Sequence, residues 1–177
     1  MQQDKALLGW EDTTLLDHTL ARLSAVTSDV ALLPGATLRY ADRGVRLILD
    51  AHGDAGPLGA VASALQSTAR PRGLFLGVDL PFVSVALLEY LIQRSEGWDV
   101  TVPAWDRGHE PLCAVYTREC LAPILDRIEN EALEMTSFWR HVRVQEIGLP
   151  ELRAFGDPSE LFRNLNTRPD YDSARLR

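Results

Sequence analysis

Short apolar runs that alternate with helix-like segments constrain the fold of this chain more than any other feature. The runs end at Gly, Pro or Asp, and the segments between them carry apolar residues at helical spacing. The expected strands are residues 30–33, 45–49, the stretch GLFLGVD, 99–103 and 112–117, and another short apolar segment lies at about 142–147. The expected helices are residues 13–25, with Asp12 or Thr13 as N-cap, 58–68, 83–94 and 119–128. This alternation predicts an α/β fold: a Rossmann-like, doubly wound, mostly parallel sheet in three layers.

Length and composition limit the class of protein. A chain of 177 residues has the size of a single domain, and we expect one unit across residues 1–177. No apolar run reaches the length of a membrane span, and the N-terminus lacks a secretion signal, so a cytoplasmic location is expected. The formal net charge of -7 and a pI near 5.1, without a basic cluster, argue against nucleic-acid binding.

Two carboxylates follow predicted strands directly. Open α/β sheets bind ligands beyond the carboxyl ends of their strands, which is where Asp50 and Asp79 fall. Asp79 is the stronger candidate, because Mg²⁺ prefers one or two carboxylates together with phosphate oxygens. The alternative is that Asp79 only caps the helix that follows Leu80-Pro81.

A glycine-rich turn at residues 53–59 precedes the second helix. Its glycines would let backbone N–H groups approach a base, ribose or phosphate, although the spacing matches neither G-x-G-x-x-G nor G-x-x-x-x-G-K-[ST]. From position alone, a tight loop that starts a helix is the simpler interpretation. By the same reasoning Lys5, close to the terminus, is a solvated charge.

Cysteine and histidine chemistry has little support. Cys113 and Cys120 lack zinc-site spacing, and we interpret both as buried small hydrophobes rather than a disulfide or a reactive thiol. The four histidines, at positions 18, 52, 109 and 141, form no spaced pair. There is no G-x-S-x-G elbow, so hydrolase chemistry is not indicated.

Five stretches together resemble the molybdenum cofactor guanylyltransferase (MobA-like) family of nucleotidyltransferases. They are DKALL at 4–8, GPLGAVASAL at 56–65, GVDLPF at 77–82, EPLCAVY at 110–116 and FRNLNTRPD at 162–170. They occur in the family's order and cover nearly the whole chain.

The N-terminus departs from that family's pattern. The family opens with a strand and the signature L-A-G-G-x-S-x-R-M-G-x-D-K, and residues 1–5 match only its last part, with Gln2 in place of a glycine. The expectation is a truncated or degenerate relative whose sheet lacks its central first strand, which leaves an open apolar slot. Pro34-Gly35 also stands where the family often carries a nucleotide-contacting Asn.

The resemblance implies a reaction and roles for residues. The reaction is transfer of GMP from GTP to the phosphate of molybdopterin, with release of pyrophosphate. Catalysis of such a step comes from positioning and charge neutralisation. The residues up to about 95 would bind nucleotide and those from about 96 would bind molybdopterin. The implied roles are Lys5 on phosphate, Asp79 on Mg²⁺, Asp50, Gly56, Pro57, Leu58 and Gly59 on the nucleoside, and Glu110, Asn164, Asn166 and Thr167 on the pterin, with Arg107 and His109 as added positive charge.

Two alternatives stay open. One is a catalytically inactive relative that binds a pterin cofactor or a partner such as a molybdoenzyme. The other is a transferase that uses CTP, because related cytidylyl enzymes share the fold and the strand-end acid. From position alone, Asn164 and Asn166 would form a turn near Pro169, and their place in the matched stretch favours a ligand role.

Overall fold

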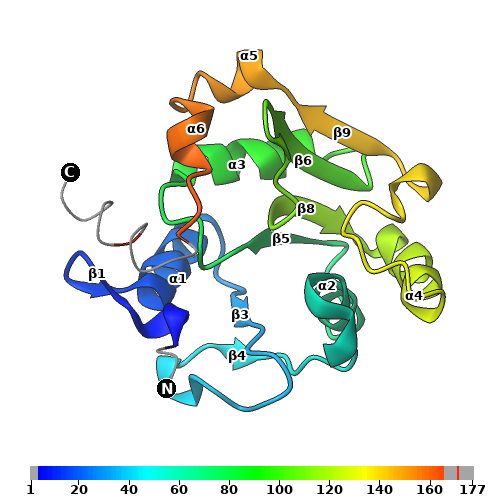
Figure 1. The fold of residues 1–177 in the computed structure, drawn as a ribbon, viewed down its shortest axis with the longest axis horizontal. Coiled ribbons are helices and arrows are strands. Elements are labelled where there is room, and N and C mark those ends of the chain that lie inside the picture. Colours follow the sequence, from blue (N-terminus) through cyan, green and yellow to red (C-terminus); the bar gives the residue numbers. More distant parts are fainter. Residues whose placement is uncertain (1–3, 166–170, 172–177) are drawn as a thin grey trace.

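A mixed sheet forms the centre of the molecule in the computed structural model, which describes residues 4–165 and Tyr171 (Figure 1). Its strands lie in the order β5 (Arg72–Leu76), β8 (Cys113–Thr117), β6 (Val100–Trp105) and β7 (Gly108–His109), and β9 (Val144–Ile147) also pairs with β6. β5 and β6 are both antiparallel to β8, and β9 is parallel to β6. Three of the four longer strands therefore share one direction, and the predicted mostly parallel α/β sheet is confirmed.

A second, smaller sheet lies apart from the first. It consists of β3 (Ala31–Leu32) and β4 (Arg46–Leu47), which are parallel to each other. A short antiparallel hairpin, β1 (Gly9–Trp10) with β2 (Thr13–Thr14), precedes the first helix. Among the described residues no strand joins β3 to β5.

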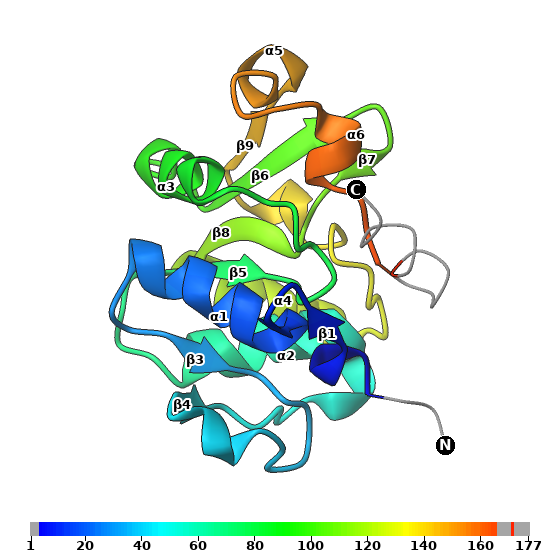
Figure 2. The same cartoon turned by 90° about the vertical axis from the view of Figure 1, so that its left-hand side faces the viewer.

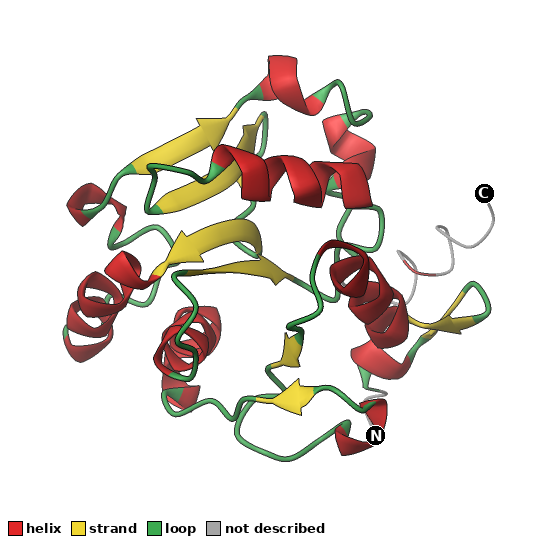
Figure 3. Cartoon of the chain, turned by 180° about the vertical axis from the view of Figure 1, so that it is seen from behind, coloured by secondary structure: helices red, strands yellow, loops and turns green. Residues whose placement is uncertain are grey.

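Helices cover both faces of the main sheet and make three layers (Figures 1 and 3). α2 (Gly56–Gln66) and α4 (Leu121–Glu129) pack on one face, where Tyr116 and Phe138 are fully buried. α1 (Leu15–Val26) and α3 (Val85–Arg94) lie on the other, over Leu74, Leu76 and Val115. Short helices α5 (Leu149–Leu152) and α6 (Pro158–Leu161) follow β9 at one end (Figure 2).

The helix starts follow ordinary capping chemistry, with one correction. The side chain of Thr14 accepts the N–H of Asp17 and caps α1, so the prediction of Asp12 or Thr13 was wrong. Thr13 is instead in β2. Ser84 caps α3 in the same way, through the N–H of Leu87.

Two strands are shorter than predicted, and the glycine-rich turn has a different structure from the one predicted. β3 and β4 have two residues each, where runs of four and five were expected. Residues 53–55 form a 3₁₀ helix, and Gly56–Gln66 is already α-helical, so the predicted loop at residues 56–59 is the first turn of α2. The strands are short because a ladder of backbone hydrogen bonds needs a neighbouring strand, and β3 has one on a single side.

Both cysteines are buried and free, as predicted. Burial raises the pKa of the Cys113 thiol well above its ordinary value and that of Cys120 to about 12. Neither thiol is therefore a nucleophile at neutral pH.

Candidate functional site

Lys5 and Asp79, far apart in the sequence, meet beyond the carboxyl end of β5. Lys5 Nζ lies 3.6 Å from Asp79 Oδ2. The Lys5 side chain is 31% exposed to solvent and the Asp79 side chain 24%. The carboxylate folds back over Gly77, where a Cβ atom would lie 2.5 Å from Asp79 Oδ1. Gly77 is therefore needed for this position of the carboxylate. The pair joins a cation and an anion that solvent can still reach.

Asp4 fixes the backbone that carries Lys5. Its Oδ1 accepts the N–H of Ala6 at 3.1 Å, and its Oδ2 accepts the Tyr40 hydroxyl at 2.5 Å and Arg39 Nη1 at 3.2 Å. Burial and the hydrogen bond to Asp4 raise the pKa of Tyr40 to about 12. We assigned Asp4 no role from sequence, although it belongs to the matched D-K pair, because its partners lie more than thirty residues away.

The C-terminal segment returns to the same edge of the sheet. The N–H of Leu165 donates to the carbonyl of Asp79 at 3.1 Å, and Leu165 packs in a small cluster with Trp10 and Phe82. Asn164 is exposed beside this contact. The structure thus brings Leu165, the residue after Asn164, into contact with Asp79, while Asn166 and Thr167 lie outside the described residues.

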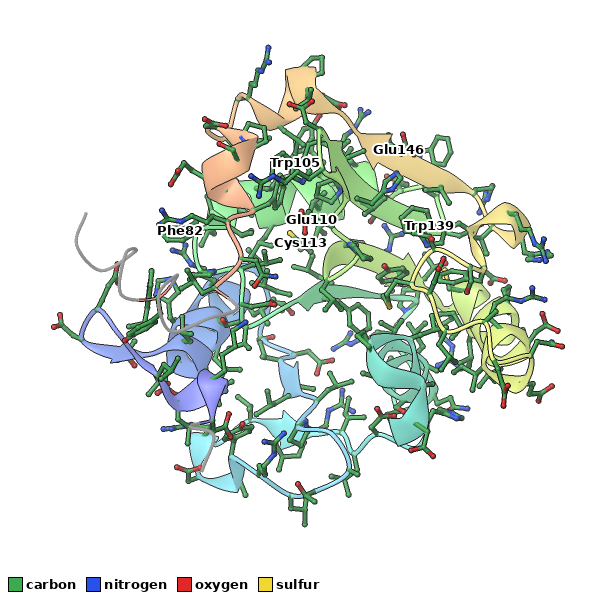
Figure 4. The ribbon with its side chains drawn as sticks, in the orientation of Figure 1. Phe82, Trp105, Glu110, Cys113, Trp139 and Glu146 are labelled. Atoms are coloured by element: carbon green, nitrogen blue, oxygen red, sulfur yellow. The ribbon has the colours of Figure 1, made fainter. Side chains whose placement is uncertain are left out.

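Glu110 is the second acid near this edge. It follows β7, and its Oε1 accepts Trp105 Nε1–H at 2.8 Å (Figure 4). Burial raises the pKa of the Glu110 carboxyl, and the nearby charge of Asp79 raises it further. Glu110 therefore stands in a partly dry environment within electrostatic reach of Asp79.

Aromatic and basic side chains lie near Trp105 and Phe162, and of these only Arg107 was predicted from the sequence. Trp105 and Phe162 have ring centroids 5.8 Å apart, and the Arg107 guanidinium lies 5.5 Å from the Trp105 centroid. Arg163 lies 4.3 Å over the ring of Phe82. Flat rings beside guanidinium groups suit a planar heterocycle with an anionic substituent. The sequence signal for the others was that Phe82, Phe162 and Arg163 lie within the matched stretches at 77–82 and 162–170.

Asp50 is engaged within the protein. Its Oδ1 accepts the hydroxyl of Ser63 at 2.9 Å and the N–H of His52 at 2.8 Å. The same Ser63 hydroxyl also bonds the N–H of Ala51. Asp50 thus ties the end of the β4 segment to α2, and these contacts account for an acid at this position without a ligand.

The four residues at the start of α2 differ in what they expose. Gly56 and Pro57 are exposed, whereas Leu58 is fully buried in the core and Gly59 is buried against the carbonyl of His52, where a Cβ atom would clash. Only Gly56 and Pro57 offer surface to a ligand. The remaining predicted residue, His109, lies beside Glu146, with Nε2 to Oε1 at 2.8 Å, and edge-on to Trp139.

The Asp79 carboxylate is the group at this site that could serve as a ligand of Mg²⁺. The described residues contain no group of three His, Cys, Asp or Glu side chains placed to hold a metal. Asp79 alone, with substrate phosphates and water, matches the coordination that Mg²⁺ accepts. In the same part of the chain no helix is both long and apolar enough to cross a membrane.

Solved structures share this fold. The fold matches molybdopterin-guanine dinucleotide biosynthesis protein A from Archaeoglobus fulgidus with a TM-score of 0.82 at 21% identity, over 97% of this chain and 89% of that one. It also matches 2-C-methyl-D-erythritol 4-phosphate cytidylyltransferase from Thermus thermophilus with a TM-score of 0.70 at 17% identity, over 97% and 92%. At these identities the likeness shows the fold alone.

Sequence comparison shows the family of this chain. Residues 1–144 match the MobA-like NTP transferase domain. A probable molybdenum cofactor guanylyltransferase of Pelotomaculum thermopropionicum is 31% identical over 99% of this chain and 86% of its own length. One from Methanosarcina acetivorans is 30% identical over 96% and 81%. The chain belongs to the MobA-like NTP transferase family, as the sequence motifs predicted.

Proposed function

We propose that this chain transfers GMP from GTP to molybdopterin and releases pyrophosphate. The observation that carries the proposal is the Lys5–Asp79 pair at the carboxyl end of β5, 3.6 Å apart and open to solvent. A nucleoside triphosphate needs both a cation for its phosphates and a carboxylate for its metal, and this pair supplies them at one point. The names of the relatives support GTP and molybdopterin as the substrates.

Each residue of the site has a proposed role. Lys5, held by the Asp4 network, would balance phosphate charge, and Asp79 would hold Mg²⁺, which when bound draws charge from the triphosphate. Glu110, Trp105 and Asn164 would receive the pterin on the adjoining surface. Gly56 and Pro57, which are exposed, would face the nucleoside, and Asp50, bonded to Ser63 of α2, would position the helix that they begin. Because the nucleophile is a substrate phosphate, the protein's part is to orient it in line with the α-phosphate.

The direct test measures pyrophosphate release with Mg²⁺, molybdopterin and either GTP or CTP. We expect turnover with GTP, and Asp79→Asn to lower kcat by about a hundredfold or more while the circular dichroism spectrum is unchanged. Glu96→Gln, which alters an exposed acid at the end of α3, is the matched control and should keep full activity. Wild-type turnover in Asp79→Asn would remove the metal role, and a preference for CTP would reassign the nucleotide.

A second candidate is a pterin-binding protein without transferase activity. The observation that favours it is the incomplete packing on the nucleotide side, where β3 and β4 have no buried strand residue, while β6 and β8 are almost wholly buried. Calorimetric titration separates the two candidates. Heat with molybdopterin but none with GTP–Mg²⁺ or CTP–Mg²⁺ would support the second.

A further inference from the structure

Tyr40 has a left-handed backbone, which is unusual for an aromatic residue. Its φ and ψ are 62° and 26°, and it precedes a 3₁₀ helix at Ala41–Arg43. Gly44, at the other end of that helix, has a similar conformation with φ 70°. Glycine adopts these angles without steric cost, whereas a large side chain at positive φ is strained. Such strain persists only where surrounding contacts hold the residue in place, so the contacts of the Tyr40 side chain indicate why tyrosine stands here.

The Tyr40 hydroxyl binds a carboxylate that is 36 residues away in the sequence. It donates to Asp4 Oδ2 at 2.5 Å, and Arg39 Nη1 donates to the same oxygen at 3.2 Å. The other terminal nitrogen of Arg39, Nη2, donates to the carbonyl of Pro34 at 2.8 Å. Burial and the bond to Asp4 raise the pKa of Tyr40 to about 12, so the hydroxyl stays protonated and remains a donor at neutral pH. Neighbouring side chains at 39 and 40 thus hold one oxygen of Asp4.

The two oxygens of Asp4 bind different parts of the chain. Oδ1 accepts the N–H of Ala6 at 3.1 Å and caps the 3₁₀ helix at Lys5–Leu7. Oδ2 joins the start of that helix to Tyr40. Loss of the hydroxyl would leave Oδ2 to Arg39, whose side chain is 54% exposed, and exposed ion pairs hold a geometry weakly. The orientation of this short helix therefore depends on the Tyr40 hydroxyl.

The ammonium group of Lys5 is sensitive to that orientation. A lysine carries its charge on a flexible four-carbon stem, so the place of the charge is defined only when the backbone that carries the stem is fixed. Here Lys5 Nζ lies 3.6 Å from Asp79 Oδ2. Lys5 is also the only lysine in the sequence, so no other lysine of this chain can take its place.

We propose that Tyr40 is a positioning residue for Lys5. Through Asp4, its hydroxyl sets the direction of the helix at Lys5–Leu7 and so keeps the ammonium group beside Asp79. The consequence for catalysis rests on the proposed function: the same hydroxyl would keep the ammonium group on the phosphates of GTP as negative charge develops there. A glycine at position 40 would relieve the backbone strain but would provide no hydroxyl.

The position of Lys5 can be observed directly, because [¹³C]lysine labels this side chain alone. A fixed lysine gives separate NMR signals for its two Hε protons, whereas a freely rotating one gives a single averaged signal. We expect separate signals in the wild type and an averaged signal in Tyr40→Phe. Tyr40→Gly, which removes the strain together with the hydroxyl, should also give the averaged signal.

Tyr90→Phe is the matched control for this experiment. The Tyr90 hydroxyl donates to a carboxylate in the same way, at 2.7 Å from Glu151 Oε1, on α3. Its removal should leave the Lys5 signals separate. An averaged signal in the wild type, or separate signals in Tyr40→Phe or Tyr40→Gly, would overturn the proposal.

Enzyme kinetics test whether Tyr40 acts through Lys5. Tyr40→Phe should lower kcat for pyrophosphate release about tenfold and change KM for GTP less than about twofold, whereas Tyr90→Phe should change neither. In a chain that already carries Lys5→Met, Tyr40→Phe should have no further effect. An equal loss in both backgrounds would mean a merely structural role and would contradict the proposal. Because the NMR experiment needs no nucleotide, absence of turnover in the wild type would count against the transferase function alone.

Discussion

The two sheets of this molecule arise from apolar runs of similar composition, yet they differ in burial. Val100, Val102, Ala114 and Tyr116 in β6 and β8 have no exposed area. Ala31 and Leu32 in β3 are only half-buried, and Arg46–Leu47 contains no buried residue. β8 has a neighbour on each side, whereas β3 has one. The comparison shows that an apolar run becomes a core strand only when both of its edges are paired.

The largest expected difference between the sheets is in the cost of truncating a side chain. Ile147 of β9 is fully buried, so Ile147→Ala should lower the free energy of unfolding by about 2–5 kcal/mol. Leu32 of β3 lines a cavity of about 910 Å³, which residues of β3 and β5 border, so Leu32→Ala should cost about 1 kcal/mol or less. Urea denaturation of both variants measures this, and equal losses would mean that the two sheets are equally packed.

Enlarging a side chain should change the stability of the chain in opposite directions in the two sheets. Ala114 of β8 has no space around it, so Ala114→Leu should destabilise the chain by about 1–3 kcal/mol. Ala31 borders the cavity, and Ala31→Leu should stabilise the folded chain by about 0.5–1 kcal/mol because new apolar area is buried. Thermal unfolding midpoints should therefore move in opposite directions, and a fall in both would contradict an open cavity.

Two Asp–Arg pairs extend the comparison to charge. Asp99, which precedes β6, accepts Arg143 Nη2 at 2.8 Å and Nε at 3.1 Å, and its side chain is 9% exposed. These hydrogen bonds hold the pKa of Asp99 below its ordinary value. Asp99→Asn should cost about 1–2 kcal/mol at pH 7, whereas Asp29→Asn should cost less than about 0.5 kcal/mol because the Asp29–Arg70 pair is exposed.

The pH dependence of the Asp99 effect has a definite sign. A carboxyl whose pKa is lower in the folded state stabilises that state above its unfolded pKa of about 4, and the contribution disappears as pH falls through the folded value. The difference between wild type and Asp99→Asn should therefore be constant near neutral pH and shrink below about pH 4. A difference that grows on acidification would contradict the assignment.

Local patterns were sufficient to predict most elements of this fold. Apolar runs located β5, β6 and β8, and helical spacing located α1 to α4 within a few residues. The family match brought Lys5 and Asp79 into one hypothesis, and the structure places them 3.6 Å apart. The lengths of β3 and β4 were not predictable in this way, because they depend on which edges are paired.

The side-chain contacts around the site could not be predicted from the sequence either. Trp105 bonds to Glu110 across a turn, and Arg163 stacks on Phe82 from another element. Such contacts depend on how α6 and the segment after β5 are placed, and no spacing rule encodes this. Similarly, Asp50 looked like a ligand residue from its strand-end position, but its carboxylate bonds to Ser63 of α2.

Backbone hydrogen exchange along β5 tests the central claim, that this strand has a free edge on the cavity, most directly. Within one strand, the amides of Gly73 and Phe75 point to β8 and those of Leu74 and Leu76 point to the cavity. The account predicts alternating rates, with Leu74 and Leu76 exchanging about a hundredfold faster or more. Equal, strong protection of all four amides in the isolated chain would contradict it.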